Sequence, residues 1–257
     1  MSKLKRPARA SIKTPRRGAQ SITKISVIAI DGPVAAGKTV VARLLAQRLR
    51  YRYLDTGVMY RAITWLALQQ GISIDDAAAL GALAEANPVS LPDSLEPETR
   101  EHEGSSQVRV AGHIVGPELR DSQVTGNVSL VSRISQVRTA LVKQQRDIGD
   151  QGDIIMVGRD IGTVVLPDAD LKVFLTASTE VRAKRRWQEM QDQGQDVDLR
   201  QVLQETKARD DLDTLRADSP LFPAVDALQV DTDVISAEQV VEELLAHIRR
   251  LSQSDLS

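Results

Sequence analysis

Cysteine is absent from the 257-residue sequence, which excludes disulfides, thiolate metal sites and thiol nucleophiles. Aromatic residues make up 3% of the chain, too few for the stacking platforms that bind single-stranded nucleic acid. Apolar runs such as Ile25–Ile30 are far shorter than the ~20 residues that cross a bilayer. These absences favour a cytoplasmic protein with no membrane partner and no stable nucleic-acid partner.

Acidic residues are missing from Met1–Lys24, a segment that holds eight of the 33 basic residues. The remainder carries 25 basic and 35 acidic residues, so it lacks the basic surface of a nucleic-acid binder. The segment also has few apolar residues and no secretory hydrophobic region, and we expect it to form a disordered basic tail. The alternatives are an organelle transit peptide and an arm that contacts RNA or anionic lipid.

A glycine-rich loop follows the first apolar run, in the stretch ISVIAIDGPVAAGKT. The loop fits the pattern G-x-x-x-x-G-K-[ST], with its glycines at Gly32 and Gly37. The run before it is typical of a strand buried on both faces, and Val40–Arg50 has apolar residues at helical spacing. In this setting backbone N–H groups cradle phosphate oxygens and Lys38 reaches the β and γ phosphates. The Thr39 hydroxyl is then expected to ligate Mg²⁺.

Strands and helices alternate along the rest of the chain, which predicts a parallel α/β sheet. Further strands are predicted at Tyr53–Leu54, Ile154–Val157, Leu171–Leu175 and Leu228–Asp231. Gly57 is expected to form a tight turn after the first of these. The proline-rich stretch Asn87–Asn127 contains an alternating run, Val108–Val115, which predicts a small hairpin outside the main sheet. Apolar periodicity predicts single helices over Ser129–Ile148 and Ala237–Leu251.

Arginines recur near the ends of these elements. Arg61 lies in the first turn of a predicted helix, where the dipole disfavours a cation, and Arg159 follows a strand at the edge where open α/β sheets bind ligands. Arg182, Arg185 and Arg186 share a helical face and repel one another unless an anion lies among them. Ordinary salt bridges are the alternative explanation. Two segments are inserted into the predicted core, one between the second strand and Asp153 and the other between the fourth strand and Pro220. Because both carry arginines, the pattern favours phosphoryl transfer between two bound phosphates.

Together, these motifs resemble those of bacterial-type cytidylate kinases, in unbroken order from Ile25 to the C-terminus. The matching pieces are IAIDGPVAAGKT, YLDTGVMYRA, VGRDIGTVVLPDADLKVFLTAS, EVRAKRR, ARDDLD and SPL. The resemblance implies a P-loop three-layer core with a five-stranded parallel sheet, a CMP-binding insertion and a small helical lid. It also implies transfer of the γ-phosphoryl group of ATP to CMP or dCMP, with Mg²⁺, by an enzyme that we expect to be a monomer.

The resemblance further implies the residues of the site. The loop that would hold the ATP phosphates comprises Gly32, Pro33, Val34, Ala35, Ala36, Gly37, Lys38, Thr39 and Val40. The residues implied to bind CMP are Thr56, Arg61, Ser129, Arg138, Arg159, Asp160, Asp213 and Arg216. Arg61 and Arg159 would hold its phosphate. Ser129, Arg138 and Asp160 would face the cytosine, whereas Asp213 would face the ribose. The residues implied in catalysis are Lys38, Arg159, Arg182, Arg186 and Arg209, and Thr39 is the implied metal ligand.

The same resemblance divides the chain into a core, two insertions and the tail. The core comprises residues 25–62, 153–178 and 219–257, the CMP-binding insertion residues 63–152, and the lid region residues 179–218. The tail, residues 1–24, lies outside the family pattern, and Val34 and Thr39 stand where the loop often has serines. Thr39 keeps the hydroxyl that Mg²⁺ needs. Other readings are a P-loop kinase for another monophosphate or small metabolite, and an ATP-dependent switch or RNA-binding protein that works through the basic tail.

Deletion of residues 1–24 separates these readings. We expect the shortened protein to phosphorylate CMP at an essentially unchanged rate, because the expected phosphate-binding residues all lie beyond the tail. The measurement is a coupled kinase assay of the full-length and shortened chains at equal concentration. Collapse of activity or solubility in the shortened chain would show that the tail is part of the working enzyme.

Overall fold

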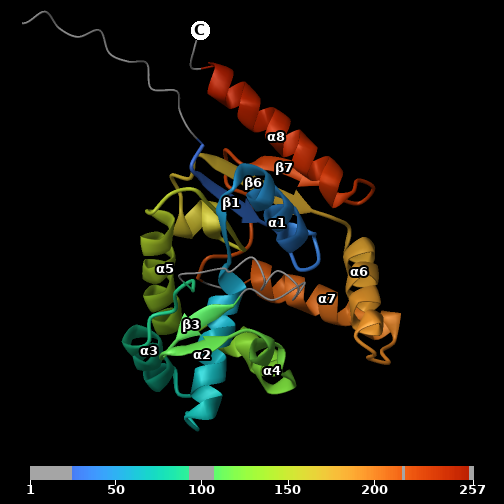
Figure 1. Ribbon diagram of the computed structural model, residues 1–257. Helices are drawn as coiled ribbons and strands as arrows, with labels where there is room; N and C mark the ends of the chain where they lie inside the picture. The colour runs from blue at the N-terminus through green and yellow to red at the C-terminus, as the bar shows by residue number, and fades with distance from the viewer. Residues whose placement is uncertain (1–24, 93–106, 216–217, 255–257) are drawn as a thin grey trace, which may run out of the picture.

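A five-stranded parallel sheet forms the centre of the fold, in the order β2-β5-β1-β6-β7 (Figure 1). The computed structural model describes residues 25–92, 107–215 and 218–254. The strands are β1 (Val27–Asp31), β2 (Arg52–Asp55), β5 (Ile154–Gly158), β6 (Leu171–Thr176) and β7 (Leu228–Asp231). Each strand coincides with an apolar run that the sequence marked as a strand. The predicted α/β class with a five-stranded parallel sheet is therefore confirmed.

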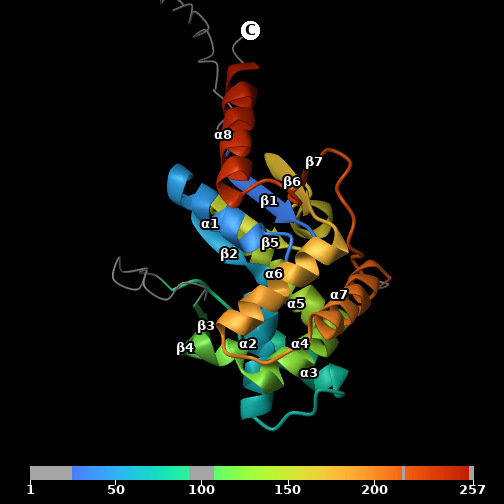
Figure 2. The ribbon, with the colours of Figure 1, turned by 90° about the vertical axis from the view of Figure 1, so that its right-hand side faces the viewer.

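Strand β1 is the middle strand of the sheet, and its side chains alternate between two apolar layers. Ile28 and Ile30 join the layer that packs under α1 and α8, whereas Ala29 joins the layer on the opposite face. Helices cover both faces, as Figures 1 and 2 show. They are α1 (Lys38–Leu49) and α8 (Ala237–Ser254) on one side, and α2 (Thr56–Gln69), α5 (Ser135–Gly149) and the short π-helix η3 (Ile161–Val165) on the other. A strand buried on both faces reads as a continuous apolar run, as β1 does.

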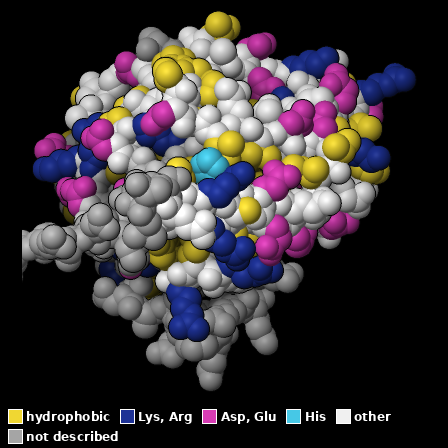
Figure 3. Space-filling model, turned by 90° about the horizontal axis from the view of Figure 1, so that it is seen from above, with side chains coloured by type: hydrophobic (Ala, Val, Ile, Leu, Met, Phe, Trp, Pro, Cys, Tyr) yellow, Lys and Arg dark blue, Asp and Glu magenta, His cyan; other side chains and the backbone are white. Residues whose placement is uncertain are grey.

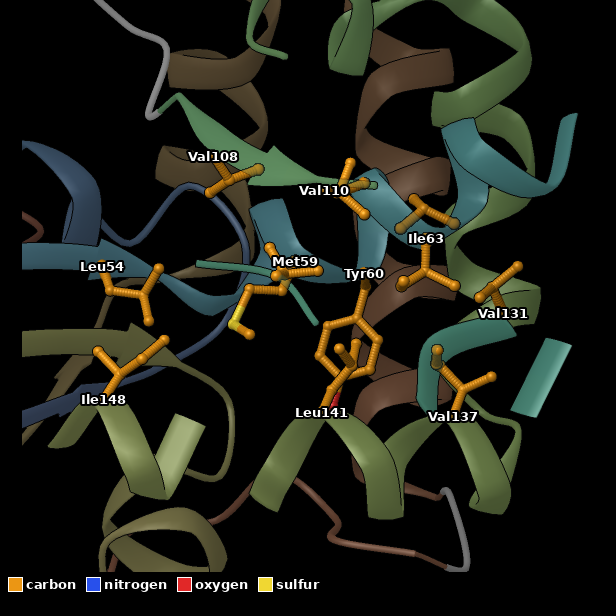
Figure 4. Close-up of a cluster of buried hydrophobic side chains, with 14 of the residues drawn as sticks. Leu54, Met59, Tyr60, Ile63, Val108, Val110, Val131, Val137, Leu141 and Ile148 are labelled. Carbon is orange, nitrogen blue, oxygen red and sulfur yellow. The ribbon is translucent and has the colours of Figure 1, made fainter. Parts of the chain in front are cut away.

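The segment between β2 and β5 builds a subdomain beyond the carboxyl edge of the sheet. It contains α3 (Ala77–Ala86), the hairpin strands β3 (Val108–Val110) and β4 (His113–Val115), the 3-10 turn η2 (Pro117–Arg120) and α4 (Ser122–Val131). The hairpin is antiparallel and separate from the main sheet, as predicted. Figure 4 shows Tyr60 of α2 and Leu141 of α5 meeting within one apolar cluster that also includes Val108, Val110 and Val131. This cluster fixes the subdomain against the sheet.

The single helix predicted over Ser129–Ile148 is wrong, because the chain breaks between α4 and α5. Ser132 ends α4, and its hydroxyl donates to the Ser129 carbonyl at 3.1 Å. Ile134 then takes an extended conformation before α5 begins. A serine hydroxyl that bonds nearby backbone offers the chain an alternative to helix, which the apolar periodicity did not reveal.

The tight turn predicted at Gly57 is also wrong, because Gly57 lies in the first turn of α2. The helix begins directly after β2, with Asp55 as its N-cap. The Asp55 carboxylate accepts a hydrogen bond from the Gly57 N–H at 3.0 Å. Strand and helix therefore join without a loop, which places the Asp55 side chain at the carboxyl edge of the sheet.

Two helices, α6 (Thr179–Asp192) and α7 (Leu199–Thr214), form the described part of the lid region. They pack against each other beside the carboxyl edge of the sheet in both views (Figures 1 and 2). Ser178 caps α6 by accepting from the Val181 N–H, and Asp198 caps α7 by accepting from the Arg200 N–H. These caps fix where each helix begins.

The outer face that carries α8 intermixes basic and acidic side chains (Figure 3). It shows no broad stripe of one charge in its described part. Among the described helices, none is both long and apolar enough to cross a membrane.

Two glycines of the loop after β1 make different demands on the backbone, which predicts different stabilities for their alanine variants. A Cβ at Gly32 would lie 2.1 Å from the Leu175 carbonyl oxygen, whereas a Cβ at Gly37 would meet nothing within 4 Å. Gly32→Ala is expected to lower the free energy of unfolding by about 3 kcal/mol or more, because backbone atoms must shift. Gly37→Ala adds only backbone strain at a φ of 87°, about 1–2 kcal/mol. Urea unfolding measures both, and equal losses would contradict the close approach at Gly32.

Candidate phosphate-binding site

The loop between β1 and α1 brings a lysine to the carboxyl edge of the sheet. Lys38 begins α1 and is buried, and its Nζ donates to the Pro33 carbonyl oxygen at 2.6 Å. Burial lowers the pKa of Lys38 well below its usual value, and the charge of Arg159 lowers it further. A buried ammonium held next to another cation is strongly stabilised by an anion. The loop therefore has the geometry and the charge expected of a phosphate cradle.

The Thr39 hydroxyl faces a carboxylate from the next strand. Its Oγ1 donates to Asp55 Oδ2 at 3.3 Å. A hydroxyl and a carboxylate are both hard oxygen ligands of the kind that Mg²⁺ takes alongside water and nucleotide phosphates. Within the described ranges, no group of three or more acidic or histidine side chains could hold a metal by itself. Sequence reasoning did not include Asp55, although a carboxylate ending the second parallel strand is the signal that could have identified it.

Arg159 links the phosphate loop to the lid region. It follows β5, and its Nη1 donates to the Gly32 carbonyl oxygen at 2.7 Å. Its Nε forms an ion pair with Asp213 of α7 at 2.7 Å. Both partners are largely buried. The structure thus brings together two residues that the resemblance assigned to neighbouring parts of the substrate, Arg159 to the phosphate and Asp213 to the ribose.

A second buried ion pair joins Arg138 of α5 to Asp160. Arg138 Nη2 lies 2.5 Å from Asp160 Oδ2, and the two residues are 5% and 6% exposed. The guanidinium also lies over the Tyr60 ring, 5.8 Å from its centroid, and donates to the Ser132 carbonyl oxygen at 3.4 Å. These contacts hold a donor and an acceptor in fixed orientation on the wall of the site. The sequence assigned both residues to the cytosine.

Arg61 and Arg209 crowd the same region with positive charge. Burial lowers the pKa of Arg61, and the charge of Arg209 lowers it next most. Burial likewise lowers the pKa of Arg209, followed by the charge of Arg159. Arg61 is held by bonds from Nη1 to the Leu119 carbonyl and the Thr125 hydroxyl, each 2.9 Å. Guanidinium groups that destabilise one another in this way favour a bound anion.

A small pocket lies between α4 and α7. It is lined by Ser129, Ser132, Arg133, Arg209, Leu212 and Asp213. Three of these residues, Ser129, Arg209 and Asp213, were predicted from the sequence as site residues. The pocket therefore lies where the segment between β2 and β5 meets helix α7.

Arg182 has every N–H of its guanidinium engaged by protein acceptors. Nε donates to the Ala177 carbonyl, and Nη2 donates to the Thr179 hydroxyl. Nη1 donates to the Val34 carbonyl, and both terminal nitrogens donate to the Asp210 carboxylate at 2.9 and 2.6 Å. Arg182 thereby ties α6 and α7 to the phosphate loop. Its neighbour Arg185 donates to the hydroxyl and the carbonyl of Thr232. The repulsion expected between these neighbouring arginines is therefore relieved by hydrogen-bond acceptors within the protein.

The remaining predicted residues lie at different depths. Thr56 is buried, and its hydroxyl donates to the Val157 carbonyl at 2.9 Å. Arg186 is more exposed and pairs with Glu189, although its charge contributes to lowering the pKa values of Arg61 and Arg209. Arg216 and the tail lie outside the described residues.

Asp31 is a buried carboxylate at this edge that sequence reasoning missed. It ends β1 and accepts hydrogen bonds from the Ile161 and Gly162 N–H groups. Burial raises the pKa of Asp31 to about 6, although both backbone hydrogen bonds lower it. An aspartate that follows an apolar strand carries no local sign of such a partner, which lies 130 residues away.

Comparison with known proteins supports the family suggested by the motifs. The cytidylate kinase family model matches residues 28–250. A cytidylate kinase of Bacillus licheniformis is 42% identical over 226 residues, covering 88% of this chain and 97% of that protein. One of Streptococcus thermophilus is 46% identical over 215 residues, covering 84% and 92%. A bifunctional pantoate ligase/cytidylate kinase of Synechococcus sp. is 45% identical over 240 residues, which are 92% of this chain but 43% of that longer protein.

The contacts of Arg182 predict a stability effect that its exposed neighbour does not share. Arg182→Lys loses the two-point bond to Asp210 and leaves buried acceptors unpaired, so we expect a loss of about 2–3 kcal/mol in the free energy of unfolding. The matched control Arg186→Lys alters an exposed pair and is expected to stay within about 0.5 kcal/mol of the parent. Urea denaturation of both variants checks this. Equal stability of the two would mean that the Arg182 contacts contribute little.

Proposed function

The chain belongs to the cytidylate kinase family, and we propose that it transfers the γ-phosphoryl group of ATP to CMP or dCMP, giving ADP and CDP or dCDP. One observation carries this proposal. Lys38, which is buried, and Arg61, Arg159 and Arg209, which are partly buried, form a cationic cluster between the glycine loop and the CMP-binding insertion. Such a cluster suits two phosphate groups that approach from opposite sides.

The glycine loop is proposed to bind the donor. Its backbone N–H groups, from Gly32 to Val40, surround the β and γ phosphates, and Lys38 exchanges its bond to the Pro33 carbonyl for a phosphate oxygen. Thr39, with Asp55 beside it, would hold Mg²⁺. Bound there, the metal would neutralise charge on the phosphates. The ATP phosphates thus lie at the N-terminus of α1, where its dipole favours them.

The acceptor is proposed to lie on the opposite side of the cluster. Arg61 and Arg159 hold the CMP phosphate, and one of its oxygens attacks the γ-phosphorus of ATP as the bond to ADP breaks. No covalent enzyme intermediate is needed, because the acceptor phosphate is itself the nucleophile. Arg209 and Arg186 neutralise the transferred group from the lid side, and Arg216 is assigned to the same set.

Base and sugar are proposed to be read by the walls of the site. Arg138 and Asp160 face the cytosine with Ser129, Asp213 faces the ribose, and Thr56 lines the acceptor side. Arg182, whose donors are all engaged, is proposed to hold the lid helices to the loop unless substrate displaces one of its bonds. We also propose that the enzyme acts as a monomer in the cytoplasm, with residues 63–152 and 179–218 as the moving parts that exclude water.

A coupled assay with CMP, dCMP, UMP, AMP and GMP as acceptors tests the function. We expect CMP and dCMP to be phosphorylated with the highest kcat/KM. A Lys38→Met enzyme, which keeps the carbon stem and loses the charge, serves as the inactive control. A different preferred monophosphate would contradict the substrate, and normal turnover by Lys38→Met would contradict the role of the glycine loop.

The Arg138–Asp160 pair predicts the choice of base. Cytosine presents an amino donor at N4 and acceptors at N3 and O2, which match the Asp160 carboxylate and the Arg138 guanidinium. Uracil reverses the first two, so both contacts are mismatched and the buried groups are left unpaired. We therefore expect the parent enzyme to prefer CMP clearly over UMP. Asp160→Asn is expected to narrow that preference by about 10-fold or more, mainly by lowering kcat/KM for CMP.

The exposed Asp168 provides a matched control for that substitution. Asp168→Asn removes the same charge outside the site and is expected to leave the CMP to UMP ratio unchanged. An unchanged ratio in Asp160→Asn would show that Asp160 does not read the base. Its place beside Arg138 would then be explained by orientation of that arginine alone.

A further inference from the structure

The Asp31 carboxylate is buried against two backbone N–H groups from another part of the site. Oδ1 accepts from the Ile161 N–H at 2.8 Å and Oδ2 from the Gly162 N–H at 2.7 Å, and the residue is 5% exposed. These are the first two N–H groups of η3, which have no partner within their own helix. Asp160, which precedes η3, makes no side-chain cap. Asp31, at the end of β1, therefore caps η3, which follows β5 in the chain.

Arg159 adds a hydrogen bond between the end of β1 and the segment that leads into η3, and its acceptor is a backbone carbonyl. Its Nη1 donates to the carbonyl oxygen of Gly32, the residue directly after Asp31. The chain at 31–32 thus holds the chain at 159–162 through three hydrogen bonds, two accepted by a carboxylate and one accepted by a carbonyl. Because η3 follows Asp160 without a linker, displacement of Ile161 would move both Arg159 and Asp160 relative to the phosphate loop.

The Asp31 carboxylate presents a separate oxygen to each of the two N–H groups. Burial disfavours the ionised form of Asp31, and the nearby charge of Asp160 disfavours it further, whereas Lys38 favours it. An asparagine of nearly the same shape carries no charge to bury, but it has one acceptor oxygen, and its amide would direct a donor at the second N–H. An unsatisfied buried donor at this point would weaken the attachment of residues 159–162 to residues 31–32.

We propose that Asp31 is a positioning residue for phosphoryl transfer, whose carboxylate holds the Arg159–Asp160 segment against the phosphate-binding loop. This inference rests on the proposed function of the site. Asp31 acts through Arg159 and Asp160, and contacts neither nucleotide. A displacement of about 1 Å between reacting groups can lower a rate about 100-fold, so a small loosening has a measurable effect.

The test compares Asp31→Asn with a matched control, Asp170→Asn. Asp170 also accepts two backbone N–H groups, those of Ser26 and Val27, but both on the single oxygen Oδ2, which an asparagine oxygen can replace, and at the opposite end of β1. For Asp31→Asn we expect kcat to fall roughly 10- to 100-fold, KM for ATP to change little and the CMP to UMP ratio to shrink. For Asp170→Asn we expect parent-like kinetics. Equal losses in both variants would overturn the proposal, since they would reveal only a general weakening of β1.

Amide hydrogen exchange at Ile161 and Gly162 provides a readout that does not depend on the substrate. We expect one of the two to lose protection in Asp31→Asn and neither in Asp170→Asn. If the parent enzyme fails to phosphorylate CMP, the proposed function fails. The exchange result still tests whether the Asp31 carboxylate holds the Ile161 and Gly162 N–H groups. Parent-like exchange together with parent-like kcat in Asp31→Asn would refute the positioning role.

If Asp31→Asn does not fold, Asp31→Ala, folded in the presence of formate, leaves room for a small carboxylate. Formate added to that variant is then expected to raise kcat, because its two oxygens can accept both N–H bonds. Chloride at the same ionic strength is the control. No gain with formate, or an equal gain with chloride, would overturn the proposal.

Discussion

Positive charges that repel one another at the carboxyl edge of the sheet are the constraint on which this site depends. Lys38, Arg61 and Arg209 all have pKa values lowered by burial and by neighbouring cations. A fold retains such an arrangement at a cost to stability, and bound anions offset that cost. Two phosphate groups, one on each side of the cluster, would relieve the repulsion where charge also develops during transfer.

Each cation reaches the edge from a different part of the fold, so the surrounding contacts have to keep these parts in register. Arg159 connects β5 to the loop after β1 and to Asp213 of α7. Arg182 and Asp210 connect the lid helices to the same loop, and Asp31 connects it to η3. These links all meet at the phosphate loop. The loop, which is proposed to bind phosphate, is therefore also the point from which the rest of the site is positioned.

Most of the fold could be predicted from the sequence because periodicity and glycine placement are local signals. The five strands and the hairpin at Val108–Val115 follow from such patterns. The break at Ser132 could not be predicted in this way, because the apolar spacing continues across it. The partners of Arg182 and Asp31 depend on contacts between distant segments, and no local pattern reports them. The roles of Lys38 and Thr39 could be predicted because both residues belong to one short sequence motif.

The central claim is that one cationic cluster binds two nucleotides' phosphates at once. The most direct measurement is calorimetric titration with an analogue in which adenosine and cytidine are joined through five phosphates. We expect this analogue to bind at least about 100-fold more tightly than either ATP or CMP alone, because one molecule would fill both halves of the site. Affinity no greater than that of ATP, with CMP unable to compete, would contradict it.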